Sequence, residues 1–383
     1  MSRFRPSLGA LLTHVHRSGP MSRAALARRM GVNRSTIMAL TRELAAAGLL
    51  EHQHAATRSG AGRPSLVVRP RPERAYVLAF DIGTDRSVAA RVGLGGQLLD
   101  RREADTPTRT SGQDMCDVLA ELGQQIQQSA TPGSACVGAG AALDAEPMTI
   151  GTDLRRLFGR PVVVGRRAQL AAVAERERGA GAGFHDVVYL QGGDRVDGGI
   201  IVDGAILGHH DGQTPTIGHM LVDPQHGRPC SCGSLGCLDT RLGRDALLAT
   251  AGRDPEAGHH DAVRAMVRDA AAGDHTAAKA LAIAGDWLGI AVANLITLIR
   301  PQVVILDGTL RYLYAGAAEQ VHARIAHHAT PDTRRPTDLR PGILGQNAAL
   351  LGAAELGFAA FLDDPLHMRS PRLRSGSGGQ AFH

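Results

Sequence analysis

The stretch GHMLVDPQHGRPCSCGSLGC, residues 218–237, gathers four side chains that bind soft metals within one glycine-rich segment. The four are His219, Cys230, Cys232 and Cys237. Thiolate sulfur and imidazole nitrogen are the ligands that zinc prefers, and four of them complete a tetrahedral site. Because no position stays open for a substrate, the segment predicts a structural zinc site. Two alternatives remain open: a disulfide among the cysteines, and His226 in place of His219.

Charge is unevenly distributed along the 383 residues, which are too many for one ordinary core and predict two or three compact units. Residues 1–72 hold twelve arginines against only Glu43 and Glu51, a net of +10, whereas the whole chain has a net charge of +5. The remainder is therefore acidic. Such asymmetry is typical of nucleic-acid binding, because basic side chains displace condensed counterions from phosphates.

Membrane and export signals are weak. No uninterrupted apolar run reaches the roughly 18 residues that a membrane span requires. Residues 1–12 lack the long apolar region of a secretory signal. We therefore expect a cytoplasmic protein with no membrane partner.

Three short helices are predicted in the basic end. Apolar residues at helical spacing indicate a first helix over residues 8–15. Ser22 is placed to cap a second helix that Gly31 ends, and Asn33 to cap a third that Gly48 ends. Three short helices with a glycine turn predict a helix-turn-helix, although the helices by themselves also fit an ordinary three-helix bundle.

The third helix is expected to carry the DNA-reading surface. Ile37, Leu40 and Leu44 form its predicted buried stripe. The predicted DNA-contacting residues on this helix are Arg34, Ser35, Thr36, Met38 and Arg42. Its N-terminal part is expected to reach base edges in the major groove, and Arg42 to meet phosphate.

A hairpin is predicted after the third helix. Residues 49–52 and 66–69 can pair as strands around the loop 58–65, and such a hairpin forms a wing. Its Gly-Arg-Pro tip would place Arg63 in a minor groove, where narrow A·T tracts concentrate negative potential. A solvated turn is the alternative. Residues 69–72, Arg-Pro-Arg-Pro, are the predicted linker.

Two motifs carry a resemblance to a known family. The segment SRAALARRMGVNRSTIMALTRELAAAGLLE, residues 22–51, resembles the winged helix-turn-helix of transcriptional regulators of the ROK family, which comprises repressors, open reading frames and kinases. The Gly-His pair followed by C-x-C-G-x-x-G-C resembles the zinc loop of the same family. From Tyr76 onward, short apolar strands alternate with helices, as in an α/β body.

The resemblance implies a body of two lobes with the actin-like, ribonuclease H-like ATPase fold and a cleft between them. The expected units are a winged helix-turn-helix domain with linker at 1–72, a small lobe at 73–185 joined by a C-terminal helix at about 345–362, a large lobe with the zinc loop at 186–344, and a disordered tail at 364–383.

The phosphate loops of ROK kinases are altered in this chain. The family's D-I-G-G-T-K corresponds to DIGTDR at residues 81–86, where Thr84 replaces the second glycine. The family's G-T-G-x-G-G-G-I corresponds to GDRVDGGI at residues 193–200. Asp194 and Asp197 would repel phosphate there. We therefore expect no ATP as a ligand.

The catalytic position of the family is also changed. ROK kinases carry N-D-A-N-A-A-x-x-x-E, whose Asp is the general base, and the corresponding residues 166–175 read RRAQLAAVAE. Arg167 occupies the place of the base, and a guanidinium cannot accept a proton. The Glu of the family's sugar-binding G-E-I-G-H is Thr216, and only His219 is retained. The resemblance thus implies that the chain is not an enzyme and has no catalytic residues.

Two interpretations of this altered cleft are open. In the first, charged residues pair and close it: the basic members are Arg166, Arg167 and Arg195, and the acidic members are Asp85, Asp194 and Asp197. In the second, the arginines bind an anionic effector such as a sugar phosphate or sugar acid. The effector-binding residues would then be Arg166, Arg167, Thr216 and His219.

The leading functional hypothesis is a DNA-binding transcriptional regulator of the repressor type. Its body would serve as scaffold of a homodimer or tetramer and as effector sensor, and two copies would match a palindromic operator. An active carbohydrate kinase with an appended DNA-binding domain is one alternative. A zinc- or redox-responsive regulator is the other.

Overall fold

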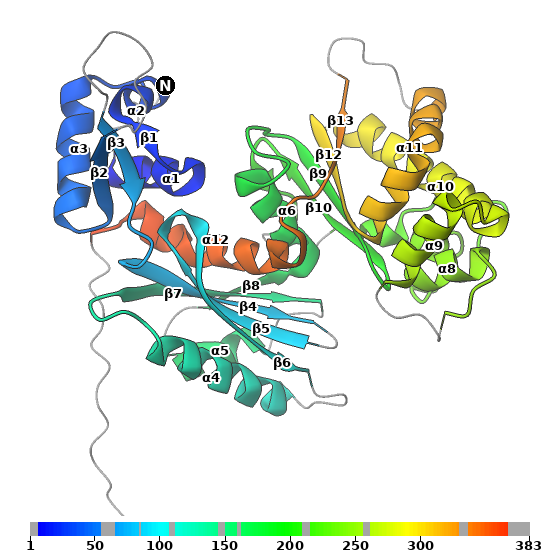
Figure 1. Cartoon of the computed structure of the whole chain (residues 1–383), viewed down its shortest axis with the longest axis horizontal. Helices are drawn as coiled ribbons and strands as arrows, with labels where there is room; N and C mark the ends of the chain where they lie inside the picture. The colour runs from blue at the N-terminus through cyan, green and yellow to red at the C-terminus, as the bar shows by residue number, and fades with distance from the viewer. Residues whose placement is uncertain are drawn as a thin grey trace, which may run out of the picture.

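Three β-sheets organise the molecule, one in the N-terminal domain and one in each of two larger lobes (Figure 1). The computed structural model describes residues 7–54, 66–83, 86–106, 112–144, 150–158, 162–208, 215–255, 261–328 and 336–366. Arg63, Thr84, Asp85 and most of the predicted tail at 364–383 lie outside this part of the chain.

The N-terminal domain is the predicted winged helix-turn-helix. It comprises α1 (Leu8–Ser18), β1 (Met21–Ser22), α2 (Arg23–Met30), α3 (Arg34–Ala46), β2 (Leu50–His54) and β3 (Leu66–Pro70), with strand order β1-β3-β2. Both predicted caps form: the Ser22 hydroxyl accepts the N–H of Ala25 at 3.1 Å, and Asn33 Oδ1 accepts that of Thr36 at 2.8 Å. Gly31 ends α2 in the left-handed region, with φ 65°.

Two local predictions for this domain need correction. The buried face of α3 consists of Ile37, Thr41 and Leu44, and Leu40 is only half-buried. Thr41 tolerates burial because its hydroxyl donates to the carbonyl of Met38 at 3.2 Å. The predicted linker at 69–72 also begins too early, since β3 continues to Pro70.

The small-lobe sheet has the order β6-β5-β4-β7-β8. Its strands are β4 (Ala75–Ile82), β5 (Arg86–Gly93), β6 (Gln97–Asp105), β7 (Ala135–Leu143) and β8 (Val162–Arg166), with the short helix η1 (Leu94–Gly96) between β5 and β6. Helices α4 (Gly112–Gln128) and α5 (Ile150–Phe158) cover one face, and α12 (Ala348–Asp363) covers the other (Figure 1).

Glycines in β7 set the distance between the sheet and α12. A Cβ at Gly138 would lie 2.1 Å from the carbonyl oxygen of Gly357, and one at Gly140 would lie 2.0 Å from that of Ala353. No side chain fits at such a distance, so the helix backbone rests directly on the strand. This contact holds α12, near the C-terminal end of the chain, against β7 of the small-lobe sheet.

The large-lobe sheet has the order β11-β10-β9-β12-β13. Its strands are β9 (Val187–Gly192), β10 (Val196–Val202), β11 (Ala205–Ile206), β12 (Val303–Gly308) and β13 (Asp338–Pro341). Its helices are η2 (Ile217–His219), α7 (Asp239–Leu242), α8 (Arg244–Thr250), α9 (Ala262–Ala271), α10 (His275–Ile299), α11 (Thr309–His328) and η3 (Gly345–Asn347).

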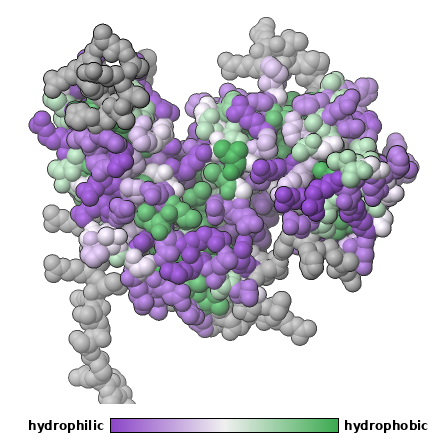
Figure 2. All heavy atoms as spheres, viewed as in Figure 1, coloured by the Kyte–Doolittle hydropathy of each residue, from purple (hydrophilic) through white to green (hydrophobic). Residues whose placement is uncertain are grey.

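In the described part of the chain, α10 is the one helix long and apolar enough to cross a membrane by length and composition. Lys279 and Asp286 interrupt its apolar sequence, so it contains no uninterrupted apolar run of membrane-spanning length. Leu281, Leu288 and Val292 of this helix belong to the large-lobe core together with β9 and β12. Hydrophilic residues also predominate on the molecular face drawn in Figure 2. The contacts of α10 with β9 and β12 are those of a core helix.

Helix α6 (Arg167–Arg178) lies between the two lobes (Figure 1). Its Leu170 joins the core that contains α12, and Ala172 joins the core of Tyr189 and Ile305 in the large lobe. The helix therefore packs against both lobes at once.

The N-terminal domain docks on α12 through an apolar contact and a buried polar cluster. Side chains of α1 and α12 share one hydrophobic core. Beside it, Arg178 donates to Glu355 Oε1 through Nε at 2.7 Å and through Nη2 at 2.5 Å. The same guanidinium donates to the carbonyl of His16 at 3.0 Å and lies 2.7 Å from His16 Nε2. His16 Nδ1 in turn accepts the N–H of Gly95 at 3.0 Å. We call His16, Arg178 and Glu355 the junction cluster.

Burial would raise the pKa of Glu355, but the attraction of His16 and Arg178 outweighs it and lowers that pKa to about 2 from an ordinary 4.5. A carboxyl group with a lowered pKa contributes stability above its unfolded pKa and loses it as the pH falls through its folded pKa. The junction cluster therefore stabilises the fold at neutral pH.

The lowered pKa of Glu355 predicts a pH dependence of stability. At pH 7 Glu355→Gln should lower the free energy of unfolding by roughly 3 kcal/mol. The difference from wild type should shrink as the pH falls from 4.5 towards 2. Urea unfolding of both full-length proteins across this range measures it. A difference that is constant with pH would contradict the assignment.

Candidate functional site

The outward face of α3 is exposed. Ser35, Met38 and Arg42 are exposed, as is Arg34 at the start of the helix, and Thr36 is half-buried. Asn33 Oδ1 accepts the hydroxyls of both Ser35 and Thr36 at 2.8 Å. These two hydroxyls thus take part in the helix cap and keep lone pairs that can still accept hydrogen bonds.

The segment at 218–237 brings its four predicted ligands together. The ligand atoms of His219, Cys230, Cys232 and Cys237 all lie within 4.8 Å of one another. His219 Nδ1 is 3.5 Å from Cys230 Sγ, and the Sγ atoms of Cys232 and Cys237 are 3.6 Å apart. Tetrahedral zinc with bonds of about 2.0–2.3 Å separates its ligands by about 3.5–3.8 Å. The cluster therefore fits zinc.

The two alternatives for this segment are not what the structure contains. All three cysteines of the segment are free thiols. His226 is exposed and lies outside the cluster. Its backbone N–H donates to Asp223 at 3.0 Å and its carbonyl accepts from Arg241 at 2.9 Å, so it contributes backbone contacts to the loop.

Backbone turns shape this cysteine loop. Gly233 has φ 90°, and its N–H donates to the carbonyl of Cys230 at 3.0 Å. At Gly236, φ is 76° and a Cβ would lie 2.1 Å from the carbonyl oxygen of Asp223. The backbone N–H of Ser234 lowers the pKa of Cys232 to about 7, whereas burial raises the pKa of Cys237 to about 12. Because thiolates are the metal-binding form, metal binding here would release protons.

The position to which the family resemblance assigns the catalytic base holds an ion pair. Arg167 donates to both carboxylate oxygens of Asp81, at 2.6 and 3.2 Å, and to Asp144 Oδ2 at 3.1 Å. Burial raises the pKa of Asp81, although Arg167 opposes this. Burial by itself would lower the pKa of Arg167, but Asp81 outweighs it and raises that pKa. The guanidinium of Arg167 is permanently charged, and its hydrogen bonds to Asp81 and Asp144 fix its position.

The expected pairing in the cleft is partly wrong. Arg166 does pair with Asp197, at 3.2 Å. Asp194, however, pairs with Arg244 at 2.6 Å. Arg167 pairs with Asp81 of β4, which was not among the expected acidic partners, and Asp85, which was, lies outside the described residues.

Two buried groups at the base of the large lobe were not predicted to interact. The hydroxyl of Tyr189 donates to Asp307 Oδ2 at 3.0 Å, and the N–H of Gly308 donates to Oδ1 at 2.8 Å. Burial and the nearby Asp307 raise the pKa of Tyr189. The two residues lie on the neighbouring strands β9 and β12, far apart in the sequence.

The predicted effector residues lie on different elements. Arg166 ends β8 and Arg167 begins α6, whereas Thr216 caps η2 and His219 ends it. Thr216 is exposed, and its carbonyl accepts the N–H of His219 at 3.0 Å. This turn presents His219 to the cysteines.

Comparison with known sequences reveals relatives in two functional groups. The xylose repressor of Bacillus subtilis is 24% identical over 374 residues, which cover 92% of this chain and 95% of that protein. The N-acetylmannosamine kinase of Shigella boydii is 33% identical over 186 residues, 45% of this chain and 63% of that protein.

Comparison with solved structures agrees on the fold. A ROK family transcriptional regulator, described as a homologue of the Escherichia coli MLC protein, superposes with a TM-score of 0.74 at 22% identity, over 91% of this chain and 94% of that one. The ROK hexokinase of Thermus thermophilus gives a TM-score of 0.64 at 27% identity, over 75% of this chain and 99% of the hexokinase.

Family models match both parts of the chain. The MarR family model matches residues 9–58, within the winged helix-turn-helix domain. The ROK family model matches residues 77–359, which include both lobes, the cysteine loop and the cleft. This match spans well over half of the 383 residues, and the chain belongs to the ROK family.

Proposed function

We propose that the chain is a DNA-binding transcriptional repressor whose kinase-like body does not phosphorylate sugars. The observation that carries this proposal is the ion pair of Arg167 with Asp81, which is formed by two hydrogen bonds. It lies where the family resemblance assigns the catalytic base, in a body fused to a winged helix-turn-helix. The similarity to the Bacillus subtilis xylose repressor, which extends over both parts of the chain, supports it.

The kinase alternative is disfavoured by the chemistry of the cleft. Phosphoryl transfer to a sugar needs a proton acceptor beside the hydroxyl, and Arg167 supplies only donors. Asp194 and Asp197 also add negative charge where the family's second phosphate loop would bind nucleotide. The similarity to the N-acetylmannosamine kinase of Shigella boydii covers less than half of this chain, whereas that to the xylose repressor covers nearly all of it.

The charges of the cleft favour the closed interpretation. Arg167 bonds to both Asp81 and Asp144, and Arg166 bonds to Asp197. Two guanidinium groups thus face three carboxylates, so these five residues have no excess of positive charge for an anion. An anionic effector would have to displace carboxylates from Arg167. We therefore propose that the cleft is held shut by these pairs when no effector is bound.

The DNA interface is proposed to be the exposed face of α3. Ser35 and Met38 would read base edges, and Arg42 would contact phosphate. We further propose that two copies of the chain bind a palindromic operator, because a two-fold dimer presents two identical recognition helices.

The cysteine loop is proposed to hold one structural zinc ion. The donor set fits zinc, and four protein ligands leave no open coordination position. The ion would link η2 to the turn that precedes α7, through His219 and Cys237. Such a site contributes directly to folding, so loss of the ion should destabilise the large lobe.

Arg42 gives a direct test of the DNA interface. Arg42→Ala should weaken binding to all duplex sequences and reduce the slope of log affinity against log salt by about one, because one phosphate contact is lost. Fluorescence anisotropy at several salt concentrations measures both. Arg324→Ala, which replaces a half-buried arginine of α11, is the matched control and should change neither. If residues 73–383 bound DNA as tightly as the whole chain, the interface would be assigned to the wrong domain.

The zinc proposal can be tested by elemental analysis. Protein purified without added metal should contain one zinc ion per chain, and Cys232→Ser should lose it and melt at a lower temperature. His226→Ala is the matched control and should retain both zinc and stability, since His226 lies outside the cluster. Full zinc content in Cys232→Ser would refute the site.

The absence of kinase activity is a separate prediction. Calorimetry with Mg·ATP should detect no micromolar binding, and a panel of hexoses should not be phosphorylated. Arg167→Asp should not restore turnover by itself, because Asp194 and Asp197 still oppose the nucleotide. Clear turnover by the wild-type chain would contradict the proposed function of the body.

A further inference from the structure

Helix α6 begins and ends with an arginine that bonds to other parts of the protein. Arg167, its first residue, pairs with Asp81 in the cleft, and Arg178, its last residue, contacts the DNA-binding domain. A helix of 12 residues spans roughly 16 Å. One rigid element therefore joins the cleft of the body to the docking surface of α1.

Close backbone packing restricts the movement of α6. A Cβ at Gly352 of α12 would lie 1.8 Å from the carbonyl oxygen of Leu170, and one at Gly199 of β10 would lie 2.6 Å from the Cβ of Ala172. No flexible side chain lies between these surfaces to absorb a displacement. A shift of α6 must therefore move its neighbours or change its contacts at both ends.

The contacts at the far end of α6 reach the backbone of the DNA-binding domain. Arg178 Nη1 donates to the carbonyl oxygen of His16 in α1 at 3.0 Å, and also to that of Gly95 in the small lobe at 2.7 Å. The neighbouring Glu177 forms an ion pair with Arg17 of α1 at 3.1 Å. The last turn of α6 thus holds the last turn of α1 through both charge and hydrogen bonds.

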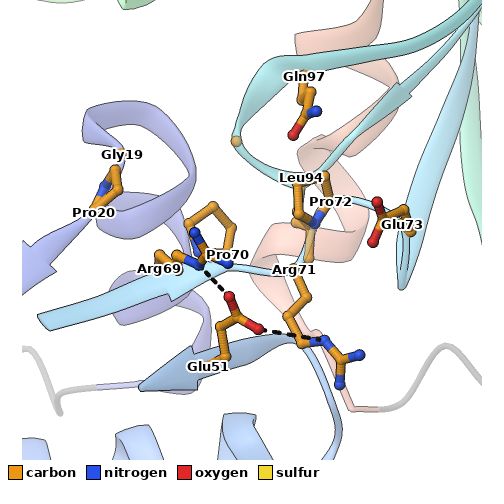
Figure 3. Close-up of a pocket in the computed structure, with 11 residues that line it drawn as sticks. Gly19, Pro20, Glu51, Arg69, Pro70, Arg71, Pro72, Glu73, Leu94 and Gln97 are labelled. Atoms are coloured by element: carbon orange, nitrogen blue, oxygen red, sulfur yellow. Dashed lines mark hydrogen bonds and ion pairs between the residues drawn. The ribbon is translucent and has the colours of Figure 1, made fainter. Parts of the chain in front are cut away.

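The rest of the domain junction is less tightly filled. A cavity of about 410 Å³ lies beside the linker, bounded by Gly19 and Glu51 on one side and by Leu94 and Gln97 on the other (Figure 3). In that view Glu51 lies between Arg69 and Arg71, its partners in ion pairs. A second cavity of about 280 Å³ lies near Arg71 and Arg74. These spaces leave the winged domain room to reorient about its linker.

We propose that α6 transmits the pairing state of Arg167 in the cleft to the DNA-binding domain through Arg178. When Arg167 leaves Asp81, α6 shifts and Arg178 changes its hold on His16, so the winged domain reorients and DNA affinity changes. The predicted change in DNA affinity rests on the proposed function, whereas the predicted coupling of Arg167 to α1 does not. The coupling between cleft and α1 exists in the protein without DNA.

A mutant cycle measures the coupling. The probe is a DNA duplex that the wild-type chain selects from genomic fragments. Arg167→Met should change the affinity for this duplex by at least about 5-fold, a typical allosteric effect. In an Arg178→Lys background, Arg167→Met should change this affinity by less than about 2-fold. Lysine keeps a positive charge beside Glu355 but cannot donate to the carbonyls of both His16 and Gly95.

The matched control is Arg324→Met. Arg324 bonds to both oxygens of Asp286, at 2.7 and 3.1 Å, in the same two-bond geometry as Arg167 but on α11. It should leave DNA affinity unchanged in either background. An equal effect of Arg167→Met in the wild-type and Arg178→Lys backgrounds, or no effect in the wild-type background, would overturn the inference.

Hydrogen exchange provides a readout that needs no DNA. In the full chain Arg167→Met should speed amide exchange in α1, residues 8–18, by at least about 5-fold, and this increase should vanish in the Arg178→Lys background. His16→Asn is a second background, since its amide oxygen can still accept the N–H of Gly95 but loses the contact with Arg178. Unchanged exchange in α1 would overturn the inference, whereas failure of the wild-type chain to bind any duplex would overturn only the proposed function.

Discussion

The packing of α12 against its neighbours is the constraint on which the rest of the structure depends. Glycines let this last helix rest directly on strand β7 and on helix α6, at Gly138, Gly140 and Gly352. The same helix shares a hydrophobic core with α1 of the DNA-binding domain and supplies Glu355 to the junction cluster. A Cβ at any of these glycines would separate surfaces that now touch. Helix α12 thus packs against the small lobe, the interlobe helix and the winged domain at once.

In the proposed account, Arg167 and the altered phosphate loops together separate this body from a kinase. Where the resemblance places the proton-accepting carboxylate of ROK kinases, this chain has the guanidinium of Arg167, which is held by two bonds to Asp81 and one to Asp144. Breaking such a partly buried pair leaves an uncompensated charge, which favours its retention in the resting state. Arg167 is also the first residue of α6. The proposed loss of catalysis and the proposed control of the winged domain therefore involve the same residue.

Much of the fold was predictable because its signals are local. The caps at Ser22 and Asn33, the apolar strands and the four ligands at 218–237 each depend on residues close in sequence. Thr41 was missed because its burial depends on a hydrogen bond to its own helix. The partners of Arg167 were mispredicted because Asp81 lies 86 positions away on another strand. His16 and Glu355 are 339 positions apart, and no sequence pattern reveals such a pair.

The most direct test of the central claim, sequence-specific DNA binding through α3, is selection of binding sites from a random pool of duplexes. The full chain is compared with a variant in which Ser35, Met38 and Arg42 of α3 are all replaced by alanine. We expect the wild-type chain to enrich one inverted repeat and the variant to enrich none while its large lobe remains folded. Enrichment of no consensus by the wild type, or of the same consensus by the variant, would contradict the claim.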